Sequence, residues 1–314
     1  MRPRAGLRPF AICLFISVLA CQSSEHFRLK RNQAGSWKVT EFHLLPTETP
    51  PGLSGLSRVS EGQTVSVAER NNVLLQILSS TRSETLQIKS VGIPEIPQGL
   101  DLEAIAILTS TSAWIGTEAK TPYRASDTLF KVSLQGAKAK VTEELQMPYA
   151  QFSRMPKTLN RSNRGIEGVC ANNKNLIVAT ELPYTVDNQR LAAFSHYSLA
   201  SRTWVPFYGP LLSKTGKISG ISCLNSLNDK QQVLFAIERH YGVAQITKVT
   251  VPNKLKKEQV LQAERIVDLS LLFDKIPNLE GIVADSNDSV TLISDNQSAS
   301  VKGQAVLLTL KRIR

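Results

Sequence analysis

Short runs of apolar and β-branched residues recur along the chain, separated by turns rich in Gly, Pro, Ser, Asn and Asp. Five runs carry Ser or Glu followed by a small residue near their start, and they cover residues 53–56, 102–105, 166–169, 218–221 and 279–282. The intervals are 49, 64, 52 and 61 residues, counted between Ser54, Glu103, Glu167, Ser219 and Glu280. Repeats of about 40 to 50 residues with insertions are typical of β-propeller blades.

A second apolar run follows each of these segments and ends on an acidic residue. The second runs cover 64–69, 113–118, 176–181, 233–238 and 290–295. Their β-branched content and short length predict strands and not helices. Five acids therefore recur at one position of the repeat.

Further runs supply the outer strands of each repeat. Third strands are predicted at 73–79, 128–134, 191–199, 244–251 and 304–313, and fourth strands at 85–91, 139–146, 203–208 and 264–269. The last repeat has only three strands, whereas 37–45 is an unassigned strand before the first repeat. If that strand completes the last sheet, the ring closes without an unpaired edge. The sequence thus predicts an all-β fold, a β-propeller of five blades closed by an N-terminal strand; six blades, one of them degenerate, is the alternative.

The N-terminus has the pattern of an export signal. Arg2, Arg4 and Arg8 precede an apolar stretch over 9–20, which is too short to span a bilayer as a helix and suits a signal-peptide core. Residues 18–21, Val-Leu-Ala-Cys, resemble the bacterial lipobox, in which the cysteine is lipidated; plain cleavage is the alternative. We therefore expect a signal peptide at 1–20, a lipidated Cys21 with a polar tether over 21–35, and the propeller domain at 36–314.

This anchor sets the expected location of the protein. The chain is held on a membrane through lipid on Cys21, in the periplasm or, because Gln22 follows the cysteine, at the outer membrane by resemblance to enterobacterial lipoproteins. With 42% hydrophobic and 20% charged residues, the rest is typical of a globular domain. Removing 1–20 leaves 34 basic against 26 acidic residues, and no basic cluster is interleaved with aromatic residues, so we expect no nucleic-acid partner. We also expect a monomer.

Two cysteines remain after the signal and the anchor. Cys170 and Cys223 each lie in an apolar, strand-like run. In an oxidising compartment they either pair or remain free buried thiols, and the sequence leaves both open. No cysteine or histidine spacing indicates zinc or haem.

The acidic repeats carry a resemblance to a known family. Ile166-Glu167-Gly168-Val169 with its second run to Glu181, and Leu279-Glu280-Gly281-Ile282 with its second run to Asp295-Asn296, resemble the phytase-like family, described as having esterase-like activity of phytase. The chain departs from the Glu-Gly pattern at Ser54-Gly55, Ser219-Gly220 and Glu103-Ala104. The resemblance covers about 50–314, and it implies a propeller and hydrolysis of ester or phosphoester bonds.

Propeller geometry predicts where the acids lie. The loop entering the first strand and the loop leaving the second emerge on one face, so both sets of acids approach one end of the ring. Close carboxylates repel one another, and a calcium ion is the natural compensation. We predict metal ligands at Glu103, Glu118, Glu167, Glu280 and Asp295. The alternative is structural: the acids cap turns or pair with adjacent arginines.

Two functions from different classes stay open. The first is a metal-dependent hydrolase of a small anionic phosphate or carboxylate ester, with Glu181 or Glu238 as base and Arg164, from the long basic loop over 148–164, steadying the anion. The second is a non-catalytic propeller that binds a protein, a glycan or a small anionic ligand. No Gly-x-Ser-x-Gly elbow or other nucleophile motif is present.

Overall fold

The computed structural model describes residues 27–69, 71–80, 83–135, 138–154, 157–160, 164–225, 231–240, 242–295 and 303–313. The predicted export signal and Cys21 lie outside the described residues. Within the part of the chain that is described, no helix has the length and apolar character needed to cross a membrane.

Four-stranded antiparallel sheets make up the first two blades and the fourth. The first contains β3 (Leu53–Ser60), β4 (Gln63–Ala68), β5 (Val73–Ser80) and β6 (Ser83–Gly92). The second contains β7 (Leu100–Thr109), β8 (Ser112–Ala119), β9 (Ser126–Ser133) and β10 (Lys140–Pro148). The fourth contains β16 (Lys217–Asn225), β17 (Gln231–His240), β18 (Val243–Pro252) and β20 (Ala263–Asp268).

The third and fifth blades carry additional short strands. The third contains β11 (Ile166–Ala171), β12 (Asn175–Thr180), β14 (Gln189–Ser198) and β15 (Thr203–Pro210), with β13 (Tyr184–Val186) and β19 (Gln259–Val260) at its margins. The fifth contains β21 (Asn278–Ser286), β22 (Ser289–Asp295), β23 (Val306–Arg312), β2 (Trp37–Leu44) and β1 (Gln33–Ala34). Two 3₁₀ turns follow blade-edge strands, η1 (Tyr149–Gln151) and η2 (Leu269–Leu271). All five predicted repeats therefore become separate sheets.

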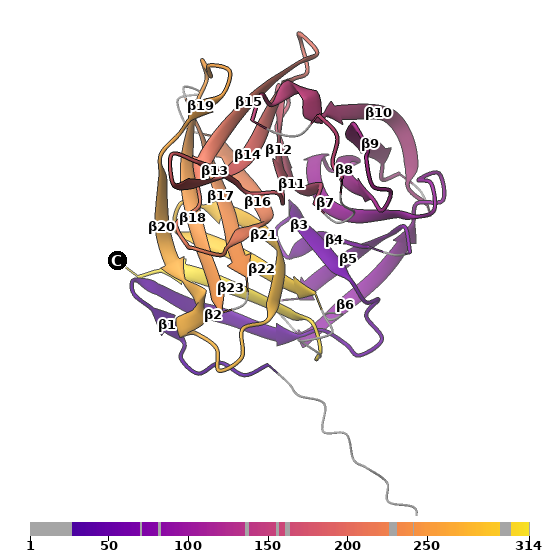
Figure 1. Cartoon of the computed structure of the whole chain (residues 1–314). Coiled ribbons are helices and arrows are strands. Elements are labelled where there is room, and N and C mark those ends of the chain that lie inside the picture. Colours follow the sequence, from indigo (N-terminus) through magenta and orange to yellow (C-terminus); the bar gives the residue numbers. More distant parts are fainter. Residues whose placement is uncertain are drawn as a thin grey trace, which may run out of the picture.

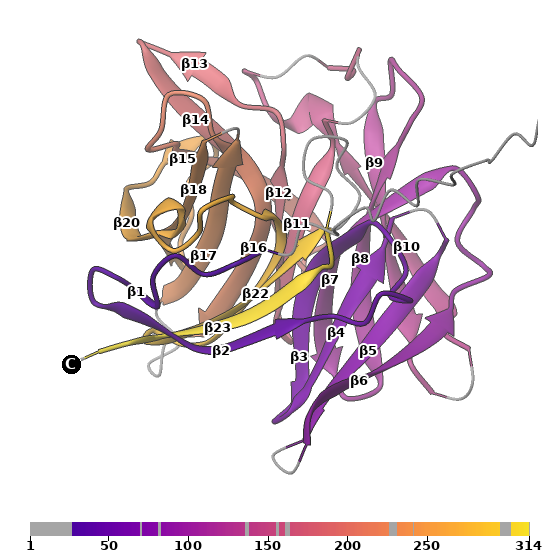
Figure 2. The same cartoon turned by 90° about the horizontal axis from the view of Figure 1, so that it is seen from below.

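The N-terminal strand closes the ring. β2 pairs antiparallel with β23, and Trp37 lies opposite Arg312 while Leu44 lies opposite Val306. Figure 2 shows the indigo β2 beside the yellow β23, with the two ends of the sequence in one sheet. Each inner strand (β3, β7, β11, β16 or β21) contacts the inner strands on both sides, as the arrangement around one axis in Figure 1 indicates. The five-bladed prediction and its closure are confirmed.

The segment before β1 packs against the propeller. Phe27 is buried among apolar residues of the fourth and fifth blades, and Leu29 forms an isolated bridge with Phe273. β1 then pairs with β2. Residues 27–35 therefore do not form the free tether predicted from their polar composition. A single aromatic residue gives no periodic signal, although it can anchor a polar segment by burying its ring.

Blade packing explains why the second strands read as unbroken apolar runs. In β12, Leu176 and Val178 face the second blade, whereas Ile177 and Ala179 face the fourth. Successive residues of a strand point to opposite faces, and each face of this sheet is covered by a neighbouring blade. Both faces are therefore buried, and alternation of apolar with polar residues is lost.

Two serines account for two of the three departures from the Glu-Gly pattern. Ser54 Oγ donates to the Glu103 carbonyl at 2.7 Å, and Ser219 Oγ donates to the Leu279 carbonyl at 2.8 Å. Both serines are fully buried, so a longer acidic side chain would have no room there. At these two positions the small hydroxyl ties one inner strand to the next.

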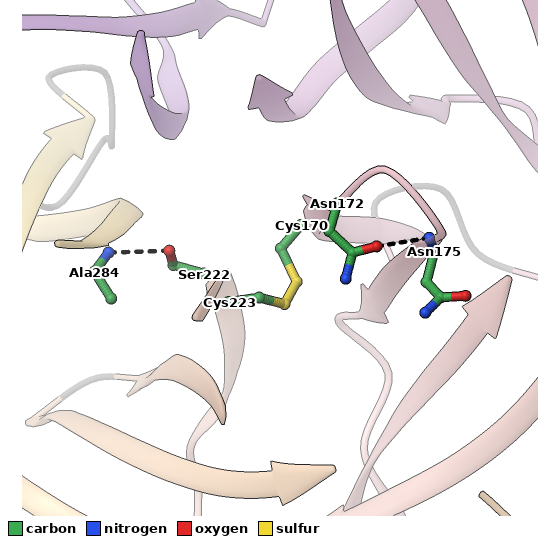
Figure 3. Close-up of a disulfide and its surroundings, with 6 residues drawn as sticks. All are labelled: Cys170, Asn172, Asn175, Ser222, Cys223 and Ala284. Carbon is green, nitrogen blue, oxygen red and sulfur yellow. Dashed lines mark hydrogen bonds between the residues drawn. A yellow bond between two sulfur atoms is a disulfide. The ribbon is translucent and has the colours of Figure 1, made fainter. Parts of the chain in front are cut away.

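One position of the inner strands, three residues after the Ser or Glu of the repeat, links neighbouring blades by a serine hydrogen bond or by a disulfide. Two backbone N–H groups donate to serine hydroxyls across blade boundaries, Ile107 to Ser57 and Ala284 to Ser222, both at 2.9 Å. Cys170 stands at the corresponding position of β11, and it is bonded to Cys223 of β16 with a Cα–Cα distance of 5.7 Å. Figure 3 shows this covalent link beside the Ser222–Ala284 hydrogen bond. The two cysteines are thus paired, and they join the third and fourth blades.

Candidate functional site: a buried acidic and basic cluster

Acidic residues gather at one end of the ring because the inner strands begin there and their partner strands end there. In the fifth blade Asn278 lies opposite Asp295, and in the fourth Ile218 lies opposite Glu238. The set consists of Glu69, Glu103, Glu118, Glu167, Glu181, Glu238, Glu280 and Asp295, and all of these except the half-buried Glu69 are buried. We call this set the acidic ring.

Glu167 and Glu103 are two buried carboxyl groups whose pKa values are raised. Burial raises the pKa of Glu167 to about 7, although the positive charges of Lys217 and Arg239 act against the shift and Glu69 adds to it. Burial also raises the pKa of Glu103 well above its ordinary value, and the nearby Glu167 carboxylate is the next cause. Within the described residues, neither side chain forms an ion pair or a hydrogen bond with a basic side chain.

Lys217 and Arg239 bring positive charge from the fourth blade into the acidic ring. Lys217 Nζ pairs with the Glu181 carboxylate of the third blade, and Arg239 pairs with Glu280 of the fifth, with Nε to Oε2 at 3.2 Å. Burial lowers the pKa of both cations, and Glu167 opposes that shift in each. Their side chains are 26% and 19% exposed, so both reach solvent while the paired acids lie beneath them.

The fifth-blade acids share an amide. Asn278 Nδ2 donates to Glu280 Oε1 at 2.8 Å and to Asp295 Oδ2 at 3.2 Å. Burial lowers the pKa of Arg239, and the negative charge of Asp295 acts against that shift. Glu280 is thus held between an amide and a guanidinium, which fixes its orientation.

Glu118 belongs to a separate buried network in the second blade. Arg124 contacts Glu118 at 3.1 Å and Asp127 at 2.6 Å, and the Tyr149 hydroxyl and the Gly165 N–H donate to Asp127 and Glu118 respectively. Burial raises the pKa of Glu118 to about 8, with the Glu167 charge as the second cause. This network ties three loops together, so its first role is structural.

Glu238, one of the predicted catalytic groups, serves local contacts. The Glu238 carboxylate is fully buried and accepts hydrogen bonds from the N–H groups of Leu212 and Ser213 and from Gln245 Nε2 at 2.8–2.9 Å. It therefore holds the 211–216 loop. Arg164, the predicted anion-binding group, lies near Tyr184. Burial raises the pKa of Tyr184, and the positive charge of Arg164 acts against that rise.

The predicted calcium ligands lie among positively charged side chains. Glu118 and Glu280 are each bound by an arginine, and positively charged Lys217 and Arg239 already act on Glu167. Among the described residues, no group of three or more His, Cys, Asp or Glu side chains is placed to hold a metal ion. Arg124, Arg239 and Lys217 supply positive charge beside the acids, which is the role that the sequence analysis gave to calcium. Calcium binding stays a prediction.

Lys217 is the site residue that sequence reasoning missed. It directly precedes Ile218 of the fourth inner strand and lies two residues before Ser219, which holds the Ser/Glu position of the repeat. That register alone places it at the same end of the ring as the acids. Arg239, next to Glu238, was expected only as a partner for its neighbouring acid, yet it reaches Glu280 on the next blade.

Together the fold and the site define a five-bladed β-propeller with buried acids and partly exposed cations at one end of its ring. The sequence profile of the phytase-like family, described as "esterase-like activity of phytase", matches residues 26–298. The chain belongs to this family.

Solved structures give more distant likenesses. The PQQ-bound aldose sugar dehydrogenase of Streptomyces coelicolor aligns with TM-score 0.49 and 10% identity, over 90% of this chain and 99% of that one. A protein of unknown function from Dyadobacter fermentans gives 0.49 and 11%, over 88% and 100%. Streptogramin B lyase gives 0.41 and 12%, over 86% and 98%. No curated protein matches the chain. All three TM-scores are below 0.5, so these structural similarities do not bear on the activity of the protein.

Proposed function

We propose that the protein hydrolyses small anionic esters, with Glu167 and Glu103 exchanging protons and Lys217 and Arg239 binding the anion. One arrangement carries the proposal: the buried Glu167 and Glu103 carboxyl groups act on each other's charge beside the cations Lys217 and Arg239, and burial raises the pKa of Glu167 to about 7. A group that gains and loses a proton near neutral pH is suited to general acid–base catalysis, and strongly perturbed carboxyl groups gather at functional sites. Membership of the phytase-like family, which is described by esterase-like activity, also supports ester hydrolysis.

The proposed reaction consumes one water for each ester bond. The Glu167 carboxylate removes a proton from water, and the water oxygen forms a bond to the phosphorus or acyl carbon of the ester. The bond from that atom to the leaving oxygen breaks, and Glu103, whose pKa burial raises well above its ordinary value, gives its proton to that oxygen. Lys217 and Arg239 balance the negative charge of the substrate. Proton exchange with solvent then restores both carboxyl groups.

A binding propeller without turnover is the second candidate. Glu181 is held by Lys217, and Glu238 accepts three hydrogen bonds from its own blade. Acids engaged in this way favour an architectural role for most of the acidic ring. In this alternative Lys217 and Arg239 bind an anionic ligand that leaves unchanged.

We also propose that the protein acts outside the cytoplasm as a lipoprotein. The support is the N-terminal sequence, with its basic start, its short apolar core and Ala20-Cys21. The Cys170–Cys223 disulfide is consistent with an oxidising compartment.

A turnover assay distinguishes the two functions. The substrates are p-nitrophenyl phosphate, phytate and the anionic mono-p-nitrophenyl succinate, with neutral p-nitrophenyl acetate for comparison, each measured from pH 5 to 9. We expect Glu167→Gln to lower kcat by about 10²-fold or more and to remove the pH limb near 7. Lys217→Met should raise KM for the anionic substrates more than for the neutral one.

The control is Glu144→Gln, because Glu144 is exposed on β10 and lies outside the site. It should match the wild type throughout. If the wild type turns over none of these esters while phosphate still binds in a Lys217-dependent manner, the binding propeller is the correct function.

A further inference from the structure

A groove lies between the third and fourth blades, at the end of the ring opposite the acidic ring. Asn175 begins β12, which runs to the acidic end, and Gln231 begins β17, which does the same. The groove therefore opens where these strands start and where β14 and β18 finish. Its volume is about 310 Å³, at the lower end of the range for small-molecule sites.

Carboxamide groups dominate the lining of this groove. Five of its lining residues are Asn172, Asn175, Gln231, Gln232 and Asn253. Ser198 adds a hydroxyl, Val251 an apolar surface and Lys174 one positive charge, and none of the described lining residues is acidic. Burial lowers the pKa of His196 on the groove wall. With five carboxamides against one lysine, the lining favours a ligand that makes many hydrogen bonds to neutral groups.

Gln232 is the residue that indicates a ligand. The residue is 8% exposed, and its carboxamide forms no hydrogen bond with another described residue. Because Gln232 lines the groove, the exposed part of its amide faces that space. A bound molecule can therefore exchange hydrogen bonds with this amide in place of water.

The groove walls are held in place before any ligand arrives. Asn172 Oδ1 accepts hydrogen bonds from the N–H groups of Lys174 and Asn175, both at 2.8 Å, which fixes the turn after β11. Figure 3 shows this turn directly beyond Cys170, whose disulfide to Cys223 joins the two blades that form the groove. A pre-organised site loses less entropy on binding.

We propose that this groove binds a neutral sugar of one or two rings. Each carboxamide presents a donor and an acceptor side by side, and each sugar hydroxyl both donates and accepts, so adjacent hydroxyls match one amide. The Val251 and Pro252 surfaces can contact the C–H faces of a sugar ring. The site is independent of the proposed ester hydrolysis, which lies at the other end of the ring.

Saturation-transfer NMR titrations of the wild type with cellobiose, maltose and N,N′-diacetylchitobiose test the proposal, with trialanine and sodium phosphate as non-sugar probes. We expect at least one disaccharide to bind. Gln232→Leu keeps the side-chain volume and removes the amide, so it should weaken that binding by about tenfold or more while the melting temperature stays equal or rises.

Two further variants make the result decisive. Gln231→Ala, an exposed change in the same groove, should also weaken binding, whereas Gln76→Leu on β5 of the first blade should bind as the wild type does. The proposal is overturned if no disaccharide binds, if trialanine or phosphate binds in their place, or if Gln232→Leu and Gln76→Leu retain equal affinity.

Discussion

Replacing Glu167 by glutamine removes one buried carboxyl group and should change how the stability of the protein depends on pH. The pKa of Glu167 in the folded protein is about 7, against 4.5 for an unperturbed glutamate. The folded protein therefore keeps this proton to a higher pH than the unfolded chain does. The associated stability is fully present below about pH 4.5 and is lost as pH rises through about 7.

The size of the effect follows from the same two values. A difference of about 2.5 pH units, at about 1.36 kcal/mol for each unit, corresponds to about 3 kcal/mol of unfolding free energy lost by the wild type between pH 4.5 and 8. Glutamine does not ionise, so Glu167→Gln lacks this loss. Removing the Glu167 charge also lowers the pKa of Glu103 and Glu118, which reduces the slope of the variant further.

Burial is the largest cause of this value, and three charged groups modify it. They are Lys217 and Arg239 of the fourth blade, which lower the pKa, and Glu69 of the first, which raises it. The assay is urea unfolding of wild type, Glu167→Gln and the exposed control Glu144→Gln at pH 5, 6, 7 and 8. We expect the stability of Glu167→Gln relative to wild type to rise steadily with pH. Parallel pH curves for all three proteins would refute the assignment of a neutral-range pKa to Glu167.

Three further predictions follow from the anchor, the disulfide and the acidic ring. Cys21→Ser should leave the exported protein unlipidated and in the aqueous phase after detergent partitioning; lipid labelling of that variant would contradict the lipoprotein proposal. Cys170→Ser with Cys223→Ser should cost about 2–4 kcal/mol of unfolding free energy, since the bridge closes a separation of 53 residues; a denaturation midpoint equal to wild type would contradict this. If the predicted metal site forms, the melting temperature of the wild type should rise with the logarithm of free calcium; an unchanged melting temperature in millimolar calcium and in chelator would contradict calcium binding and leave arginine and lysine as the charges that offset the acids.

The local features of this protein were readable from the sequence. The strands, the five repeats and the closure by 37–44 follow from runs of apolar residues and turn signals, which act over a few positions and repeat with the blade. The gathering of acids at one end follows from the up-and-down direction of antiparallel strands. The strands and their directions depend on chain neighbours, so a linear pattern is enough to predict them. Closure follows from the strand count, because the last repeat lacks a fourth strand and residues 37–45 belong to no other repeat.

The tertiary structure decided which charges meet. Lys217 neutralises Glu181 and Arg239 neutralises Glu280, each from a neighbouring blade. The burial of Phe27 and the pairing of Cys170 with Cys223 depend in the same way on distances across blade boundaries. Ionisation depends on solvent exclusion and on charges within a few ångströms, and residues tens of positions apart in the chain reach those distances only when the ring closes. For that reason the sequence identified the acids, whereas the folded ring determined which of them stay protonated.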